Sequence, residues 1–310
     1  MNPQTNNNRT RSRTTALWRF SAAGMMAAVL LGPAWALAEE REVQESRPLA
    51  ADGSVLIENE FGEIVIQGWD RNEVSISGDL SDDVRELQIR ESGSTLRIRV
   101  DYYDRRTIDG AYLEIRVPEG ASVEAESVSG DIEAGGLSGQ LLELRTVSGD
   151  LDVAARVQRV SLSSVSGDVD FSGTASRVNA ESVSGEIELS GVSGEIEAST
   201  VSGDVTVIGD TIDSGEFEAV SGDVELRVAL ADGGRIKVSS MSGDIDLYLP
   251  NGQQAEFLAQ TFSGSIDSAF GRARNSSSHG PGKRLEHLEG SNGATINLNS
   301  FSGDVSINKR

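Results

Sequence analysis

Apolar and polar residues alternate along most of the chain after about residue 50, which is the pattern of half-buried β-strands. In 142–146 the apolar side chains fall on even-numbered positions, and in 147–153 they fall on odd-numbered positions. Strand side chains alternate between faces, so this change predicts a bend or bulge between Thr146 and Val147. We expect both side chains to turn inward there, with one of them small because the corner has room for only one large group. The same pairing of a small with a large residue recurs at Ser127/Val128, Ser164/Val165, Ser182/Val183, Thr200/Val201, Ala219/Val220, Ser240/Met241, Thr261/Phe262 and Ser300/Phe301.

Each of these pairs leads into a Ser-Gly step that is usually followed by an acidic residue, and the step repeats at a nearly fixed period. Over 142–207 the period is 18 residues, and it lengthens towards the C-terminus. A fixed period near 20 residues is typical of a solenoid, in which each unit buries its apolar face by stacking on its neighbours. We therefore predict an all-β fold, a single-stranded β-solenoid of about ten coils over residues 119–310. The expected inward set of one coil is Val160, Leu162, Val165, Val169 and Phe171.

A meander of β-hairpins is the alternative fold. A two-residue Ser-Gly turn would place the valine opposite the aspartate on one face, which breaks the apolar pattern. A glycine two residues after the valine fits a close backbone approach or a positive φ angle at a solenoid corner. The handedness of the solenoid stays open.

The regions beside the repeats also read as strands. Residues 39–118 alternate without the repeat, and we expect an irregular strand-rich cap that continues into the solenoid and covers its first coil, since an open sheet edge invites aggregation. Residues 271–293 are rich in Gly, Ser and Asn and are expected to leave the stack as a flexible excursion. The chain is then expected to end in a strand at 305–307, with Lys309 and Arg310 as charged residues at the far edge.

The first forty residues have the order of a cleavable secretory signal. Arginines at positions 9, 11, 13 and 19 precede an apolar run at 22–31, and Ala-Leu-Ala follows at 36–38. We expect cleavage after residue 38. The remaining chain has no other apolar stretch of membrane-spanning length and no cysteine, which excludes disulfides. A periplasmic, secreted or cell-surface location is therefore expected.

Charge narrows the classes of partner. Removal of residues 1–38 takes away four arginines and no acidic residue, so the formal charge moves from −22 to −26. Such a charge opposes nucleic acid and an anionic membrane surface. The expected partner is an envelope component or a glycan, and the oligomeric state stays open.

The acidic corner residues are the candidate site. In-register stacking would align seven carboxylates that lie about 4.8 Å apart and repel by roughly 1 kcal/mol per pair in water. Either hydrogen bonds from backbone N–H groups of the corner or bound cations, with calcium the candidate, would compensate this repulsion. The column consists of Asp131, Asp150, Asp168, Glu186, Asp204, Asp223 and Asp244.

Other chemistry is sparse. His279 and His287 lie near Glu286 and Glu289, and they are read either as ordinary polar residues of a loop or as a divalent-metal site. No motif places a nucleophilic serine before a histidine, and no other metal or cofactor motif is present. The chain is therefore expected not to be an enzyme.

The order of motifs resembles a known family. The segments 62–70, 72–74 and 113–118, followed by serial Val-Ser-Gly-Asp units and by 248–250 and 261–264, are similar to the bacterial putative-adhesin β-strand repeat family, a domain of unknown function. The resemblance covers nearly the whole chain after the signal. It implies a solenoid-like fold and an envelope or surface setting, and it implies no catalytic residues.

The leading functional hypothesis is a non-catalytic, exported envelope protein that acts as an adhesin-like binding or scaffold module. One alternative is a polysaccharide-active β-helix enzyme, which turnover of glycans by the purified protein would reveal. The other is a passive structural element of the envelope stress response, with a deletion phenotype but no ligand.

Overall fold

The computed structural model describes residues 41–103, 109–276, 281–290 and 293–310. These residues belong to one compact unit. All regular elements of the described residues are β-strands. The all-β class is confirmed.

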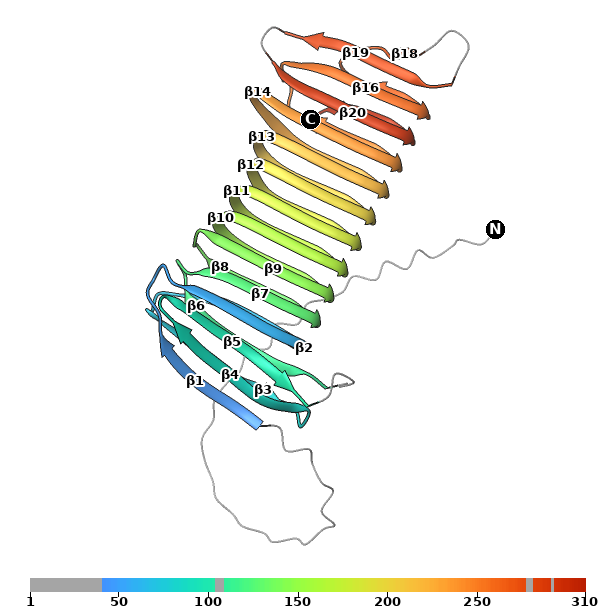
Figure 1. The fold of residues 1–310 in the computed structure, drawn as a ribbon. Coiled ribbons are helices and arrows are strands. Elements are labelled where there is room, and N and C mark those ends of the chain that lie inside the picture. Colours follow the sequence, from blue (N-terminus) through green and yellow to red (C-terminus); the bar gives the residue numbers. More distant parts are fainter. Residues whose placement is uncertain (1–40, 104–108, 277–280, 291–292) are drawn as a thin grey trace, which may run out of the picture. The chain divides into compact units, whose positions relative to one another are not determined.

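The central strands stack in parallel and in register. They are β10 (Leu151–Ser166), β11 (Val169–Ser184), β12 (Ile187–Ser202), β13 (Val205–Ser221) and β14 (Val224–Ser242). Leu151 pairs with Val169 and Val160 pairs with Val178, which is the 18-residue step of the sequence. The pairing is parallel at every step in this series. Hairpins pair antiparallel, so these strands stack as in a solenoid and do not form the alternative meander of hairpins. Figure 1 shows these strands following one another as a regular ladder.

Each long strand bends in its middle. In β10 the buried positions are odd-numbered up to Val157 and even-numbered from Val160, with two exposed residues between them. The first part of β10 pairs with β8 (Ile132–Leu137), and the second part pairs with β9 (Leu141–Ser148). One coil therefore supplies a strand segment to each of two faces, and the inward side chains of both segments form the core.

The predicted core positions are largely correct. Val160, Leu162, Val169 and Phe171 are at most 2% exposed, whereas Val165 is 45% exposed and points away from the core. Full burial of such a side chain stabilises a fold by about 1.5–3 kcal/mol. Because consecutive coils repeat these positions, the core continues along the stack as rows of aliphatic and phenylalanine side chains.

At the N-terminal end the stack runs through residues of the expected strand-rich cap. β2 (Ser54–Trp69) pairs in parallel with β7 (Ser122–Ser129) and β8, and its other side pairs in parallel with β5 (Thr95–Tyr102) and β6 (Ala111–Pro118). β3 (Glu73–Leu80) and β4 (Val84–Ser92) pair antiparallel with β6 and β5. β1 (Arg41–Pro48) adds to β3. The expected strands are present, and β2 itself belongs to the stack.

The C-terminal end differs from the expected order. β20 (Ala294–Ser302) lies between β14 and β16 (Ala255–Ser263), and β21 (Val305–Lys309) lies between β15 (Ile245–Leu249) and β17 (Ile266–Ser268). The expected strand at 305–307 is present, but it lies inside the stack. The prediction that it forms the far edge is wrong. Figure 1 shows β16 beyond β20, with β19 beside β16. The similar corner sequences of 261–264 and 300–303 let either segment stack on β14, so the repeat alone does not determine their order.

Part of the expected excursion is a strand. β19 (Lys283–Glu289) pairs antiparallel with β16, and β18 (Arg274–Asn275) pairs antiparallel with β19. Leu285 of β19 is fully buried opposite Ala259. This apolar contact is the physical reason why the segment differs from the excursion that we expected for 271–293, and β19 covers the outer side of β16.

Candidate binding surface

The corner between the two faces is the repeating unit of the surface. Thr146 is 4% exposed and Val147 is 48% exposed, so the small residue turns inward and the large one turns outward. The prediction that both turn inward is wrong. The change of parity is spread over residues 147–150, which are exposed or half-buried, and it does not occur at the single step between Thr146 and Val147.

Glycine allows the chain to turn over these four residues. Gly167 has φ +155°, and a Cβ atom on it would lie 2.0 Å from the carbonyl oxygen of Gly149 in the neighbouring coil. Gly149 has φ +154° and meets the carbonyl oxygen of Gly130 in the same way. The coils therefore approach so closely at the corner that a side chain has no space, as the sequence predicted for this glycine.

The inward residue of the corner is small and usually carries a hydroxyl group. The Oγ1 atom of Thr146 donates a hydrogen bond of 3.4 Å to the carbonyl oxygen of Gly130, and Ser164 donates in the same way to Gly149. Among the described residues, the buried hydroxyls of Ser127 and Ser240 have no hydrogen-bond partner. The inward hydroxyls thus mainly serve the fold, because they satisfy carbonyl groups of the neighbouring coil.

The outward residues form a continuous apolar row, which we call the apolar ridge. Its members lie next to serines that pair from coil to coil, so the ridge follows the corner from β7 to β16. All of its side chains are between 43% and 60% exposed, and the two phenylalanine rings at its end stack with centroids 5.0 Å apart. In stacking order the ridge consists of Val128, Val147, Val165, Val183, Val201, Val220, Met241, Phe301 and Phe262.

The repeat in the sequence identified the residues of the apolar ridge, but we expected their side chains in the core. One signal could have revealed their position. A chain that turns two successive side chains inward needs a bulge at a single step. Here four residues separate the buried positions Thr146 and Leu151, so the chain can turn gradually with only a small side chain inside the corner. Methionine and two phenylalanines at the later corners also fit an open surface more easily than a narrow bend.

The corner acids come together in one column, as the register predicted. The Oδ1 atom of Asp131 accepts a hydrogen bond of 2.9 Å from the backbone N–H of Asp150, and Asp150 accepts one of 2.9 Å from Asp168. Asp204 and Asp223 accept from the next coils in the same way. The donor is the neighbouring coil and not the acid's own corner, so each bond joins two coils. This is a form of the backbone capping that the sequence analysis gave as one alternative.

Glu186 interrupts the column. Its own N–H donates 2.8 Å to Asp168 Oδ1, but among the described residues no carboxylate accepts from the N–H of Asp204. The additional methylene group moves the glutamate carboxylate away from the position that Asp Oδ1 occupies. Burial, followed by the negative charges of Asp204 and Asp168, raises the pKa of Glu186.

A second acidic row lies beside the column. Asp152, Asp170 and Glu188 are paired from strand to strand and point outward. Burial raises the pKa of Asp170, and the neighbouring charges of Glu188 and Asp152 raise it further. This side of the corner therefore carries concentrated negative charge.

The cation alternative has no preformed ligand group in the described part of the chain, where no cluster of three or more His, Asp or Glu side chains is placed to hold a metal ion. His287 Nε2 lies 2.9 Å from Glu289 Oε2, and this contact lowers the pKa of Glu289. Glu286 pairs with Arg284. His279 lies outside the described residues. Cation binding by the column stays a prediction.

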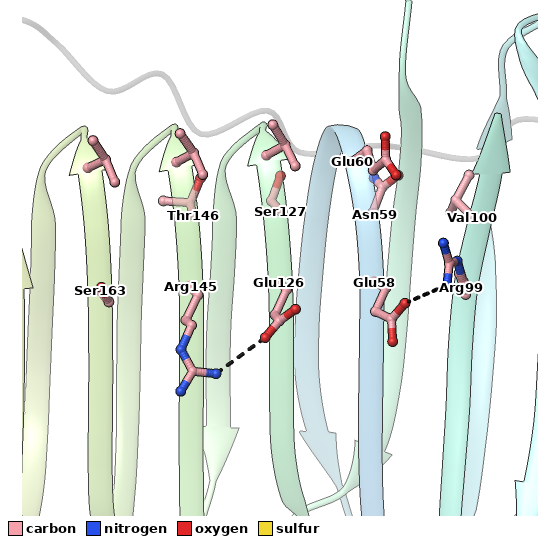
Figure 2. A pocket seen from close by; sticks show the side chains of 13 residues that line it. Glu58, Asn59, Glu60, Arg99, Val100, Glu126, Ser127, Arg145, Thr146 and Ser163 are labelled. Atoms are coloured by element: carbon pink, nitrogen blue, oxygen red, sulfur yellow. Dashed lines mark hydrogen bonds and ion pairs between the residues drawn. The ribbon is translucent and has the colours of Figure 1, made fainter. Parts of the chain in front are cut away.

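A hollow of about 460 Å³ lies beside the first residues of the apolar ridge. Val128, Val147 and Val165 line one side of it. Figure 2 shows two ion pairs between residues that line it, Arg145 with Glu126 and Arg99 with Glu58, at distances of 3.3 Å and 3.4 Å. The hollow is amphipathic and widens the apolar ridge into a surface at this end.

The strand stacking and the repeated corners define a β-solenoid-like repeat domain. The chain belongs to the family described as Toastrack DUF4097, whose model matches residues 54–233 and 231–308. This confirms the resemblance to a putative-adhesin family of unknown function. No curated protein sequence matches the chain.

Several solved structures are similar to this chain at low identity. One is described as a putative adhesin from Bacteroides fragilis, with 15% identity, a TM-score of 0.41 and coverage of 88% of this chain and 99% of that chain. Another, a putative adhesin from Parabacteroides distasonis, has 11% identity, a TM-score of 0.47 and coverage of 87% and 98%. A third, a putative lipid binding protein from the same species, has 13% identity, a TM-score of 0.44 and coverage of 88% and 98%. Within the described residues, no helix is long and apolar enough to span a membrane.

Proposed function

We propose that this chain is a non-catalytic binding module of the cell envelope, and that the apolar ridge is its binding surface. On this proposal residues 1–38 are a signal that is removed on export, and a stack of about ten coils presents the ridge in the periplasm or at the cell surface. The family is described without a function, so the proposal rests on the surface of the chain itself.

The observation that carries the proposal is the exposed apolar row itself. Soluble proteins rarely expose contiguous apolar patches larger than a few hundred Å², and such patches usually mark interaction sites. Here nine large apolar side chains, each about half exposed, follow one another without interruption. The fold does not require them, because the inward corner residue and the glycine already form the bend.

The test is site-specific photo-crosslinking in the native cell, followed by fractionation. A photoreactive amino acid replaces Val183 on the apolar ridge, and in the control it replaces Ile208, which is 42% exposed on β13 outside the ridge. We expect a discrete crosslinked product in the envelope fraction from position 183 and none from position 208. Equal crosslinking at both positions, or none at either, would contradict the proposal.

A further inference from the structure

The apolar ridge is bordered by acids along the carboxylate column, whereas on its other side two of three exposed glutamates are paired with Arg145 and Lys237. Two residues before the ridge, the exposed side chains include Glu126, Glu181 and Glu218. Three residues after it, the column of corner carboxylates follows the same direction, and the chain as a whole carries a formal charge of −22. Along the middle of the ridge, from Val165 to Val220, the residues at these two positions are acids or serines only.

We propose that the apolar ridge binds a basic amphipathic protein segment, one with an apolar row bordered by lysines or arginines. This inference rests on the proposed function and names the chemistry of the partner. Burial of the exposed apolar row supplies the affinity, at about 25 cal/mol per Å² of apolar surface. The acids beside the ridge, chiefly those of the carboxylate column, select positive charge and steer it toward the ridge.

The carboxylates of the column can serve a partner without losing their structural role. Asp150, Asp168 and Asp223 use Oδ1 to accept from backbone N–H groups. An ionised carboxylate has two oxygens with several lone pairs, so the same group can accept from an ammonium or guanidinium group of a partner. The backbone bonds also hold each carboxylate in place, which reduces the entropy that binding would cost.

Charge also favours a basic segment over the other possible occupants of the apolar ridge. A second copy of the chain would bring two strongly negative surfaces together, and an anionic lipid surface would be repelled in the same way. Arg145 pairs with Glu126 near the hollow and Lys237 pairs with Glu218 further along, so the ridge is less selective for positive charge at these two places. We therefore place the basic segment on the middle of the ridge, over Val165, Val183 and Val201 of β10 to β12.

The test uses protein purified from cells that express the full chain, and fluorescent helical peptides of about 18 residues built from leucine and lysine. One matched peptide carries glutamate in place of lysine, and another has the same Leu-Lys composition in a scrambled order. The ridge variant is Val165→Thr/Val183→Thr/Val201→Thr, which keeps the β-branched shape. The control is Ile208→Thr, and circular dichroism with thermal melting checks that both variants fold.

We expect the Leu-Lys peptide to bind in an anisotropy titration, and more weakly as salt rises because the attraction is screened. The ridge variant should raise its Kd about tenfold, and Ile208→Thr should leave it unchanged. The scrambled peptide should bind more weakly, and the glutamate peptide and phosphatidylglycerol vesicles should not bind. Equal binding of the glutamate peptide, binding of the vesicles, or ridge-dependent self-association in light scattering would overturn the inference. Crosslinking at position 183 in the cell without any binding of the Leu-Lys peptide would also overturn it, while the proposed function would stand.

Discussion

The apolar ridge and the carboxylate column follow the same corner, with the same spacing, a few residues apart. Each aspartate of the column accepts a hydrogen bond from the neighbouring coil, so the column joins coils together, with an interruption at Glu186. Each side chain of the ridge follows the equivalent residue of the neighbouring coil, and about half of it stays exposed. The repeat aligns both rows, but only the carboxylate column forms hydrogen bonds that hold neighbouring coils together. The row without them is the one available for binding.

The largest effect is expected at the corner glycine that both rows share. Gly167→Ala places a Cβ atom 2.0 Å from the carbonyl oxygen of Gly149 at φ +155°, so we expect a loss of about 3 kcal/mol in the free energy of unfolding. The control is Gly252→Ala, at φ +85° but with no atom within 4 Å, which should cost about 1 kcal/mol. Urea unfolding of both variants measures the difference. Equal losses would show that the coils do not approach as closely as described.

The next effect separates the column from the acidic row beside it. Asp168→Ala removes the acceptor of the Glu186 N–H and should lower the free energy of unfolding by about 1–2 kcal/mol. Asp170→Ala, two residues away on β11, removes a carboxylate whose pKa is raised by burial and by the charges of Glu188 and Asp152. This substitution should change stability by less than about 0.5 kcal/mol. Thermal melting of the two variants tests this contrast. A larger loss from Asp170→Ala would reverse the roles of the two rows.

A smaller effect is expected where the column is interrupted. Glu186→Asp places a carboxylate at the distance that the other corners use, so it should cap the N–H of Asp204 and raise the free energy of unfolding by about 0.5–1 kcal/mol. The matched control is Glu188→Asp in the outward row, where no such N–H is available and no gain is expected. If both variants gave the same change, the column would not depend on the position of its oxygen atoms.

The smallest effect is on pH dependence. The raised pKa values of Asp170 and Glu186 mean that the folded state keeps these protons at a higher pH than the unfolded state does. Their contribution to stability is therefore complete below the unfolded pKa and is lost as pH rises through the folded pKa. Unfolding in urea should show a small gain in stability as pH falls from about 7 to about 5, since solvent screens these partly exposed groups. In Asp170→Asn/Glu186→Gln this gain should shrink, and an unchanged gain would assign it to other groups.

Much of the fold could be predicted from the sequence because periodicity has a direct physical meaning. The 18-residue step gave the parallel register of β10 on β11, and the alternation gave the buried positions Val160, Leu162 and Phe171. The column of acids followed from the same register. These features depend only on side-chain alternation and on stacking of equal units.

Other features could not be predicted from the pattern. The outward position of Val147 depends on how residues 147–150 share the turn, and alternation does not fix this within a bend. The place of β20 between β14 and β16 is a choice between two segments with similar corners. In the carboxylate column, the backbone N–H of one coil donates to the aspartate of the preceding coil and not to an acid of its own corner. The strand register aligns the aspartates, but it does not determine where each carboxylate oxygen points.

The most direct test of the central claim uses the absence of cysteine from the chain. A single Val183→Cys variant on the apolar ridge is labelled with a maleimide, both as purified protein and in intact envelopes, beside Ser182→Cys at the inward position of the same corner. Val183 is 46% exposed and Ser182 is 5% exposed, so the purified protein should label rapidly at position 183 and slowly at position 182. In envelopes, a bound partner should slow labelling at position 183. Slow labelling of purified Val183→Cys, or equal rates with and without the envelope, would contradict the account of the apolar ridge as an exposed surface that a partner covers.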